Sequence, residues 1–288
     1  MSPPVLIGVD GGGSGCRVAV GMAQAGVLAE AQGGPANVST DFDASVANIM
    51  HTVLEALAEA GLGEVDLSHA IAHLGLAGAD LPQTQAQTAA MFPFGRTAVS
   101  GDRETTVAGV LGAVDGFVVA LGTGTILARQ QSGQIRTVGG WGFQLSDQAS
   151  GAWLGRALMT ATLSAAEHVE PGSALTREIA AEMGGVRGIF DWSATARPAD
   201  YAALAPRIFA AATAQDPVAH GLLEAGATYI ENGLTALRFT PGAPLSLTGG
   251  VGPHYAPYLP PTLTAHLVEP KGNALAGAFH LARTAAAE

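Results

Sequence analysis

Residues 7–20 read IGVDGGGSGCRVAV, and this stretch decides how the first part of the chain folds. β-Branched residues alternate with smaller ones on both sides of a glycine run, which is typical of a hairpin with a glycine-rich turn. Glycines lack Cβ atoms, so their backbone N–H groups can lie against a bulky anion. Asp10 stands at the edge of the turn, where a carboxylate could hold Mg²⁺ while the amides bind phosphate oxygens. The stretch therefore indicates either a hairpin phosphate loop or a plain turn.

Two better-known phosphate loops do not fit these residues. The dinucleotide fingerprint needs G-x-G-x-x-G opening a helix. Counted from Gly11 the sixth position is Cys16, and counted from Gly13 it is Val18, with a strand expected to follow. The Walker loop needs a lysine, and the only lysine of the chain is the distant Lys271.

The composition indicates a folded protein of one large or two medium domains. The chain has 288 residues, of which 48% are hydrophobic and 13% charged, so a substantial core is expected and disorder is not. A net charge of −11 argues against a nucleic-acid partner, which would require a basic surface. The single cysteine, Cys16, excludes an internal disulfide and a cysteine-built metal site within one chain. Cys16 alternates within the hairpin and is expected to be a small buried hydrophobe.

The sequence gives no sign of a membrane or export segment. The first residues, MSPPVLIGVD, contain neither a basic segment nor a long apolar core, so we expect no signal peptide. No run of ~20 apolar residues predicts a membrane span. We therefore expect a cytoplasmic protein with no membrane partner.

Strands and helices alternate along the first third of the chain. A turn at residues 24–26 leads into a third strand, which makes a three-stranded meander. Apolar residues at helical spacing predict a helix over residues 43–60. The elements expected after it are a strand at 70–76, a short helix at 83–91, a strand at 97–99 and a helix at 104–111.

Residues 116–140, GFVVALGTGTILARQQSGQIRTVGG, repeat the order strand, glycine turn, strand, turn, strand. Gly11 and Gly122 start corresponding turns, 122 − 11 = 111 residues apart. Such a repeat indicates an internal duplication, and two facing loops would clamp a polyphosphate between two domains. Thr123 and Thr125 could donate hydroxyls to phosphates, although strand propensity and turn chemistry also explain them.

The remainder of the chain reads as mostly helical. Helices are expected at residues 152–168, 174–183, 198–214, 218–237 and 273–287, with short strands at 244–248 and 265–268. Glycines follow the first of these strands, where the backbone could lie against a flat ring such as adenine or could form an ordinary loop. Solvent-facing helix positions are expected for Glu55, Glu59, Glu178 and Glu182. His69 and His73 suit a metal only on a helix, and their segment reads as a strand, so we expect structural roles.

The order of these motifs resembles the N-acetylglucosamine and glucosamine kinases within the BadF/BadG-type ATPases, members of the sugar kinase, actin and heat-shock chaperone superfamily. The resemblance covers most of the chain. It implies an α/β fold with two actin-like (ribonuclease H-like) domains, residues 1–111 and 112–288, and an ATP cleft between them. The last helix is allowed to pack back on the first domain.

The resemblance also implies a set of site residues. For ATP and Mg²⁺ they are Asp10, Gly11, Gly12, Gly13, Ser14, Gly122, Thr123, Gly124, Thr125, Gly249, Gly250 and Val251, with Asp10 at the metal. For the sugar they are Asn37, Gly78, Asp102, Gly140, Trp141 and Asp147.

Asp102 is the candidate general base, which would accept the proton of the sugar hydroxyl. From the residues alone, a helix cap explains Asp102 equally well. Trp141 without the resemblance would be assigned to the core, and Asp147 to a loop cap.

The implied activity is ATP-dependent phosphorylation of glucosamine at the 6-hydroxyl. N-acetylglucosamine kinases commonly have Asp-Glu-Gly-Ser where this chain has DQAS at residues 147–150, and this departure favours the free amino sugar over the N-acetylated one. We also expect a homodimer. The alternatives of another class are an ATP-hydrolysing conformational switch of the BadF type and a sugar sensor without catalysis. The redox form of that switch needs cluster-bridging cysteines, and Cys16 does not offer them.

Overall fold

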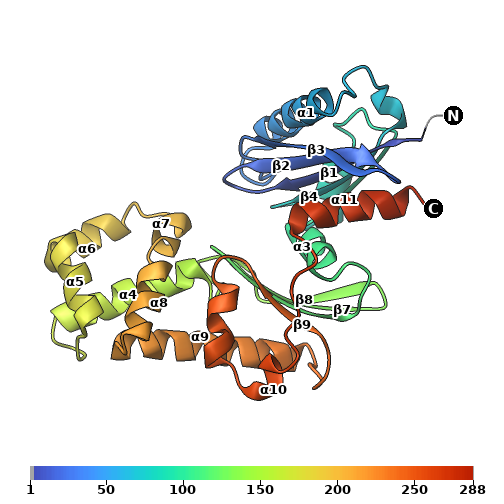
Figure 1. Ribbon diagram of the computed structural model, residues 1–288. Coiled ribbons are helices and arrows are strands. Elements are labelled where there is room, and N and C mark those ends of the chain that lie inside the picture. The colour runs from blue at the N-terminus through green and yellow to red at the C-terminus, as the bar shows by residue number, and fades with distance from the viewer. Residues whose placement is uncertain (1–2, 288) are drawn as a thin grey trace. The chain divides into compact units, whose positions relative to one another are not determined.

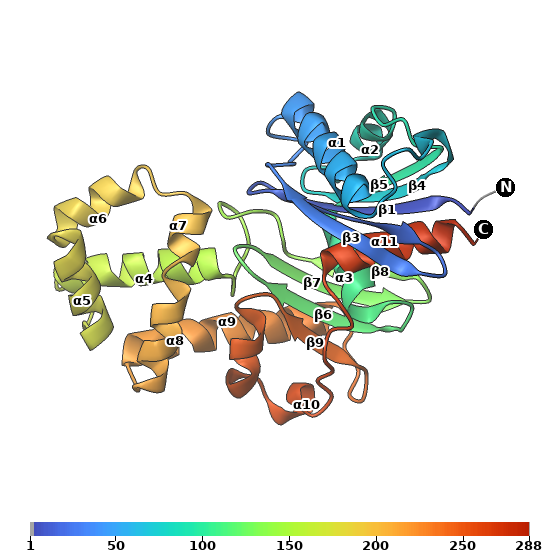
Figure 2. The same ribbon diagram turned by 45° about the horizontal axis from the view of Figure 1, so that its top comes forward.

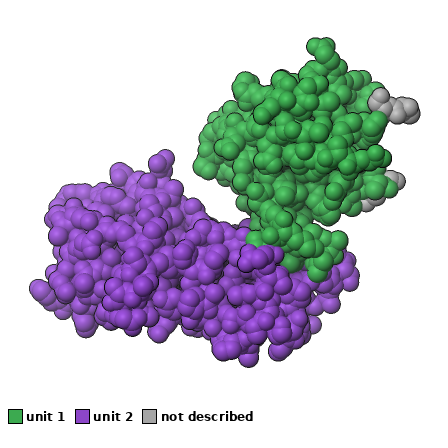
Figure 3. Space-filling view, viewed as in Figure 1, with its two compact units in different colours: residues 1–114, 270–288 green, residues 115–269 purple. Residues whose placement is uncertain are grey.

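The computed structural model describes residues 3–287, and the chain divides into two compact units (Figures 1 and 3). Unit 1 comprises residues 1–114 and 270–288, and unit 2 comprises residues 115–269. The sequence analysis assigned residues 112–288 to the second domain and allowed the last helix to pack back on the first. This helix, α11, Ala274–Ala285, does lie against α3 and the strands of unit 1 (Figure 2).

Unit 1 is built on a five-stranded sheet in the order β3-β2-β1-β4-β5. Strands β1, β2 and β3 form the predicted antiparallel meander, while β1, β4 and β5 run parallel to one another. The strands are β1 Val5–Gly11, β2 Cys16–Met22, β3 Gly26–Gly33, β4 Ile71–Leu76 and β5 Arg96–Ser100. The other helices of the unit are α1 Phe42–Glu59, α2 Pro82–Ala89, α3 Asp102–Leu111 and the short 3₁₀ turn Leu67–His69.

Both faces of β1 are covered, because successive side chains of a strand point to opposite faces. Ile7 and Val9 join the core that includes α1. Leu6 joins a second cluster with Leu275 and Phe279 of α11. Full burial of such side chains contributes roughly 1.5–3 kcal/mol each. This double coverage explains why β1 reads as a nearly continuous apolar run.

Unit 2 repeats the topology of the first four strands of unit 1. Its sheet has the order β8-β7-β6-β9, with an antiparallel meander and a parallel β6–β9 pair. The strands are β6 Gly116–Leu121, β7 Thr125–Gln131, β8 Gln134–Val138 and β9 Leu245–Thr248. The predicted mixed α/β fold and the internal duplication are therefore both present.

The strand register corrects the spacing of the repeat by one residue. Gly11 is the last paired residue of β1, opposite Cys16, and Leu121 is the last paired residue of β6, opposite Thr125. Gly11 is therefore the equivalent of Leu121, an offset of 121 − 11 = 110 residues. By the same register Asp10 has Ala120 as its equivalent, so only the first turn has a carboxylate at this position.

Helices make up most of unit 2 outside its sheet. They are α4 Gly151–Ala166, α5 Ala174–Met183, α6 Gly185–Ser193, α7 Pro198–Ala202, α8 Ala205–Thr213, α9 Pro217–Ala236, the 3₁₀ helix Gly252–Tyr258 and α10 Pro261–Thr264. The single helix predicted over residues 198–214 is two helices, since Pro206 cannot continue α7 and lies instead in the first turn of α8. The strand predicted at 265–268 is wrong: Leu267 makes only an isolated bridge to Leu245.

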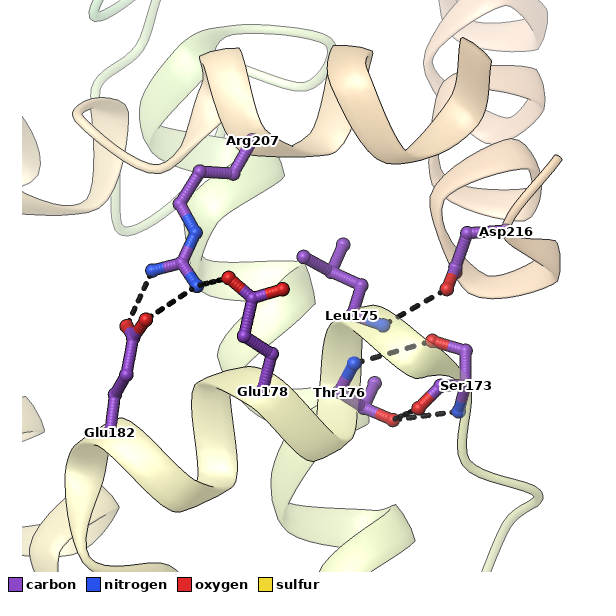
Figure 4. Close-up of polar contacts among 7 residues, drawn as sticks. All are labelled: Ser173, Leu175, Thr176, Glu178, Glu182, Arg207 and Asp216. Atoms are coloured by element: carbon purple, nitrogen blue, oxygen red, sulfur yellow. Dashed lines mark hydrogen bonds and ion pairs between the residues drawn. The ribbon is translucent and has the colours of Figure 1, made fainter. Parts of the chain in front are cut away.

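The helices α5, α8 and α9 are joined by polar contacts (Figure 4). Arg207 on α8 pairs with Glu178 and Glu182 on α5, at 2.7 and 2.6 Å. Asp216 caps α9 and also accepts a hydrogen bond from the Leu175 amide of α5. The two glutamates are exposed as predicted, and they are ion-paired as well. No helix within residues 3–287 has the length and apolar character that crossing a bilayer requires.

Candidate functional site

The carboxyl ends of β1, β4 and β5 bring several predicted site residues of unit 1 together. Because these strands are parallel neighbours, they end at the same edge of the sheet, where open α/β sheets bind ligands. Asp10 is the next-to-last residue of β1, Gly78 follows β4, and Asp102 follows β5. Chemistry-bearing residues from three strands thus lie along one edge.

Backbone hydrogen bonds fasten the first glycine turn to its neighbours on this edge. The Gly11 carbonyl accepts from the Ala77 amide and the Gly12 carbonyl accepts from the Ala36 amide, both at 2.8 Å. The turn itself closes through the Gly12 amide, which donates to the Gly15 carbonyl at 2.9 Å. The tip of the turn, Gly13 and Ser14, is exposed. Hydrogen bonds therefore hold the base of the turn in place, while its tip is accessible to a ligand.

Asn37 and Gly78 are in direct proximity. The Asn37 carboxamide oxygen accepts hydrogen bonds from the Ser39 amide at 3.0 Å and the Ser39 hydroxyl at 2.7 Å. Gly78 adopts φ +83°, and a Cβ there would lie 2.7 Å from that same oxygen. Because the carboxamide oxygen already accepts two hydrogen bonds, the NH₂ group is the part of Asn37 that can donate to a ligand. A cavity of about 260 Å³ joins Asn37 to Gly13 of the turn.

Asp10 is held by Arg17, a residue that the sequence reading did not single out. The two residues are cross-strand partners, and Asp10 Oδ2 accepts from Arg17 Nη2 at 2.5 Å and from Nε at 3.1 Å. The Arg17 side chain is 43% exposed and that of Asp10 is 17% exposed. The sequence feature that could have indicated this pair is the hairpin register, which places residue 17 opposite residue 10.

Asp102 occupies the first turn of α3 without capping it. The N-cap position is Gly101, so the helix-cap interpretation of Asp102 is wrong. Burial raises the pKa of the Asp102 carboxyl, against the opposing charge of Arg103, and Asp80 and Asp10 raise it further. A carboxylate with a raised pKa at this edge is suited to accept a proton.

A second acidic residue beside Asp102 was not predicted. Glu104 Oε2 is buried, has no hydrogen-bond partner within the described residues, and lies close to the Gly101 backbone. Burial raises the pKa of Glu104 as well. In the neighbouring strands, His73 Nε2 of β4 forms a hydrogen bond of 3.0 Å with the Ser100 hydroxyl of β5. That hydroxyl in turn donates to the Gly101 carbonyl. His73 lies on a strand in a structural position, as predicted.

The residues present fit a Mg²⁺ ion bound mainly through a nucleotide. No group of three or more His, Cys, Asp or Glu side chains placed to hold a metal occurs within residues 3–287. Mg²⁺ in phosphoryl-transfer sites commonly uses one or two carboxylates and keeps waters and phosphate oxygens as its other ligands. Asp10 supplies one such carboxylate beside the first turn.

The second glycine turn, in unit 2, is fastened by equivalent hydrogen bonds. The Leu121 carbonyl accepts from the Val251 amide at 2.9 Å, and the Gly122 carbonyl accepts from the Gly151 amide at 2.8 Å. The turn closes from the Gly122 amide to the Gly124 carbonyl at 3.0 Å. The duplication thus extends from strand order to the contacts that hold each turn.

The two threonines of this turn differ in whether their hydroxyls can reach a ligand. Thr125 is 2% exposed, and its hydroxyl donates to the Gln148 carbonyl at 2.7 Å, which is a structural contact. Thr123 is exposed. Asp147 is buried with φ +63°, and its carboxylate accepts a long hydrogen bond, 3.4 Å, from the Thr125 amide. Asp147 therefore lies against the second turn and accepts from one of its amides, as the loop-cap alternative expects.

A cavity of about 450 Å³ in unit 2 joins the second turn to the glycines after β9. Gly122 and Thr123 line one part, and Gly250 and Val251 line another; Gly249, with φ +81°, precedes them. Phe209 of α8 and His254 complete the wall, and their rings stack with centroids 4.4 Å apart. No local pattern in the sequence selects these two rings, because only the tertiary fold brings them together.

The glycine segment after β8 presents Trp141 to solvent. Trp141 is 72% exposed, so the core interpretation of this tryptophan is wrong. Gly139, Gly140 and Gly142 all have positive φ, of 77°, 71° and 87°, which sets the path of this loop. The predicted sugar-binding residues Gly140, Trp141 and Asp147 belong to unit 2, and Asn37, Gly78 and Asp102 belong to unit 1.

Comparisons with known proteins agree on the family and the fold of this chain. Residues 7–258 match the model of the BadF/BadG/BcrA/BcrD ATPase family. A glucosamine kinase of Vibrio cholerae is 30% identical over 280 residues, which cover 96% of this chain and 95% of that protein. An N-acetylmuramic acid/N-acetylglucosamine kinase of Clostridium acetobutylicum is 30% identical over 164 residues, 55% of this chain and 53% of that protein.

A solved structure extends the comparison to three dimensions. A Chromobacterium violaceum protein named a "Putative N-acetylglucosamine Kinase" is 35% identical, with a TM-score of 0.88, and the match covers 98% of this chain and 100% of that one. The predicted class of two actin-like domains is thereby confirmed.

Proposed function

Because the chain belongs to the BadF/BadG/BcrA/BcrD ATPase family, we propose that it is an ATP-dependent amino-sugar kinase that phosphorylates glucosamine at the 6-hydroxyl. The observation that carries this proposal is the shared sheet edge. Asp102, whose carboxyl has a raised pKa, follows β5 at the edge where the first glycine turn follows β1 and Gly78 follows β4, and Gly78 lies against Asn37.

In this proposal Asp102 accepts a hydrogen bond from the sugar 6-hydroxyl and takes its proton as the oxygen attacks the γ-phosphorus. The new O–P bond forms while the bond from γ-phosphorus to the β–γ bridging oxygen breaks, which releases ADP. Asn37 donates its NH₂ group to a sugar hydroxyl oxygen, because Ser39 occupies its carbonyl oxygen. Catalysis of this kind depends on positioning more than on covalent chemistry.

The two glycine turns are proposed to bind the phosphates of ATP. Gly11, Gly12, Gly13 and Ser14 act from unit 1, and Gly122, Thr123 and Gly124 act from unit 2. Thr125 supports the second turn, because its amide donates to Asp147 and its hydroxyl to the Gln148 carbonyl. Asp10 would hold Mg²⁺, which neutralises phosphate charge when bound. The 450 Å³ cavity beside Gly249, Gly250 and Val251 is of a size to take a nucleoside, with the Phe209–His254 stack as an aromatic wall.

Two of the similar proteins carry the names of different sugars. The Vibrio cholerae relative is named a glucosamine kinase, whereas the Chromobacterium violaceum structure is named for the N-acetylated sugar. Gln148 and Ala149 stand where N-acetylglucosamine kinases commonly have Glu and Gly. We therefore put glucosamine first and N-acetylglucosamine second. We further propose that the protein is cytoplasmic, since ATP is supplied in that compartment, and the expected homodimer stays a prediction.

The test is ADP release measured with glucosamine, N-acetylglucosamine, glucose and no sugar, beside the Asp102→Asn variant. Turnover that depends on glucosamine and is lost in the variant would support the proposal. Equal ADP release without sugar would instead indicate a conformational switch, and nucleotide binding without turnover a sensor. Phosphate placement on the product, read by ³¹P–¹H correlation, distinguishes the 6-hydroxyl from the others.

A further inference from the structure

A groove at the far end of α3 from Asp102 concentrates positive charge in an acidic chain. It lies between the C-terminal end of α3 and α11, has a volume of about 320 Å³, and belongs wholly to unit 1. Asp102 starts this ten-residue helix, so the groove is about 15 Å away along it. Three of its lining residues are basic, Lys271, His280 and Arg283, and none is acidic.

Each polar side chain of this groove can donate at least one hydrogen bond. Arg283 Nη2 lies 3.3 Å from His280 Nδ1. A guanidinium has no lone pair to offer, so Nδ1 accepts and the imidazole proton is on Nε2. Lys271, the single lysine of the chain, adds an ammonium group whose stem lies 3.5 Å from the position of a Cβ on Gly112. Small residues such as Gly109, Gly112 and Ala276 line the rest and leave the space open.

These charges are not used to satisfy the end of α3. Cations near a helix C-terminus often complement its unpaired carbonyls. Here the Ala108 carbonyl accepts from the Gly112 amide at 2.8 Å, and the Val110 carbonyl accepts from the Lys271 backbone amide at 3.0 Å. Backbone amides therefore do this work, and the Lys271 ammonium is not needed for it.

The charges are also not neutralised by carboxylates. Within residues 3–287, no ion pair joins Lys271 or Arg283 to an Asp or Glu side chain. Burial lowers the pKa of His280, and the charges of Arg283 and Lys271 lower it further. The groove thus has an uncompensated positive potential next to a half-buried imidazole.

We propose that this groove is a binding site for a phosphate group, either inorganic phosphate or the phosphate of a small monoester such as a sugar phosphate. A dianion would accept hydrogen bonds from the Lys271 ammonium, the Arg283 guanidinium and His280 Nε2–H. The negative charge of the ligand strengthens each of these bonds. The two chain connections between the units, at residues 114–115 and 269–270, lie within three residues of Gly112 and Lys271. An occupant therefore touches residues that are close in sequence to both connections. The site does not depend on the proposed kinase activity.

The test follows the His280 ring by NMR while inorganic phosphate is added to the full-length protein at constant ionic strength. The His280 resonance is assigned with His280→Gln. We expect a saturable shift in the millimolar range and a rise in the His280 pKa, because a bound dianion stabilises imidazolium. Parallel titrations use glucosamine 6-phosphate and sodium chloride. Tighter binding of the sugar phosphate identifies a monoester as the ligand, and equal binding identifies the phosphate group alone.

Variants distinguish a built site from general attraction to a cation. Lys271→Ala and Arg283→Ala should each weaken phosphate binding about fivefold or more, the loss of one exposed ionic hydrogen bond. Arg177→Ala, which removes an exposed cation from α5 in unit 2, should change nothing. The inference is overturned if chloride moves the His280 resonance as far as phosphate does, or if the Lys271→Ala, Arg283→Ala double variant binds phosphate unchanged.

Discussion

Asp10 and Arg17 face each other across the first hairpin, and the guanidinium donates to one carboxylate oxygen at 2.5 and 3.1 Å from its two nitrogens. The same oxygen, Oδ2, takes both bonds, so the pair leaves Oδ1 of Asp10 available. A carboxylate held in this way is oriented in advance for a cation beside the glycine turn. The arrangement occurs only in unit 1, because the equivalent of Asp10 in unit 2 is Ala120.

Removing the Asp10 charge should therefore impair the use of Mg²⁺. We expect Asp10→Asn to lower kcat/KM by roughly 100-fold and to raise the Mg²⁺ concentration needed for half-maximal rate. Arg17→Lys keeps a cation near Asp10 but loses the fork of donors, and should have a smaller effect. The measurement is the initial rate against Mg²⁺ at saturating ATP. An unchanged Mg²⁺ dependence in Asp10→Asn would remove Asp10 from the metal site.

Asp102 should be costly for stability and necessary for activity. Its pKa is raised in the folded state by burial, so the folded protein holds that proton more tightly than the unfolded chain does. Stability therefore falls as pH rises through the raised pKa, and above that pKa the ionised carboxylate destabilises the fold. Asp102→Asn should raise Tm while lowering kcat by roughly 100- to 10,000-fold.

The control for Asp102 is Glu64→Gln, which neutralises an exposed carboxylate of unit 1. This variant should leave both Tm and kcat close to their starting values. Thermal unfolding with and without substrate separates the two effects. A lower Tm together with normal kcat in Asp102→Asn would contradict both the burial argument and the catalytic role.

The buried imidazole of His73 should make the stability of unit 1 decrease in acid. Burial lowers the pKa of His73 from 6.5 to about 4 in the folded state. The unfolded chain thus binds a proton that the folded protein excludes between pH 6.5 and pH 4. The stabilising contribution is complete above pH 6.5 and is lost as pH falls towards 4, by about 3 kcal/mol in total.

His73→Gln should flatten this part of the stability curve. Glutamine cannot titrate and retains a donor for Ser100. Urea unfolding at several pH values between 4 and 7 gives the slope, with His51→Gln on the exposed face of α1 as the control. If His73→Gln and the parent lose stability in parallel below pH 6.5, the titration does not come from this imidazole.

The Phe209–His254 stack predicts a selective effect on nucleotide affinity. Both rings line the 450 Å³ cavity that contains Gly122 and Gly250. Phe209→Ala should raise the KM for ATP about tenfold while leaving the KM for the amino sugar within twofold, because only the base contact is lost. Phe190→Ala, which truncates a 62% exposed ring on α6, is the matched control. Equal rises in both KM values would place Phe209 outside a base pocket.

The sequence predicted those parts of the structure that depend on local pattern. Alternation and glycine placement specified both meanders and both turns, and helical spacing specified α1 and α9. Arg17, Phe209 and His254 were missed because their roles arise from contacts across strands or between distant segments, which no local period encodes. The split between α7 and α8 was readable from Pro206, because a helix tolerates proline in its first turn but not in its interior.

Gly78 provides the sharpest test of the Asn37 site. Its φ of +83° is unfavourable for any side chain, and a Cβ would lie 2.7 Å from the Asn37 carboxamide oxygen and the Ser39 hydroxyl. Gly61 is the matched control in unit 1, since it has φ +71° with nothing within 4 Å of the Cβ position. Gly61→Ala and Gly78→Ala should both lose about 1 kcal/mol of unfolding free energy from backbone strain. Only Gly78→Ala should also raise the KM for the amino sugar, by several-fold, because it displaces the Asn37–Ser39 pair, while the KM for ATP stays within twofold. If the two variants have the same sugar KM, Asn37 does not contact the sugar through the orientation that Ser39 imposes.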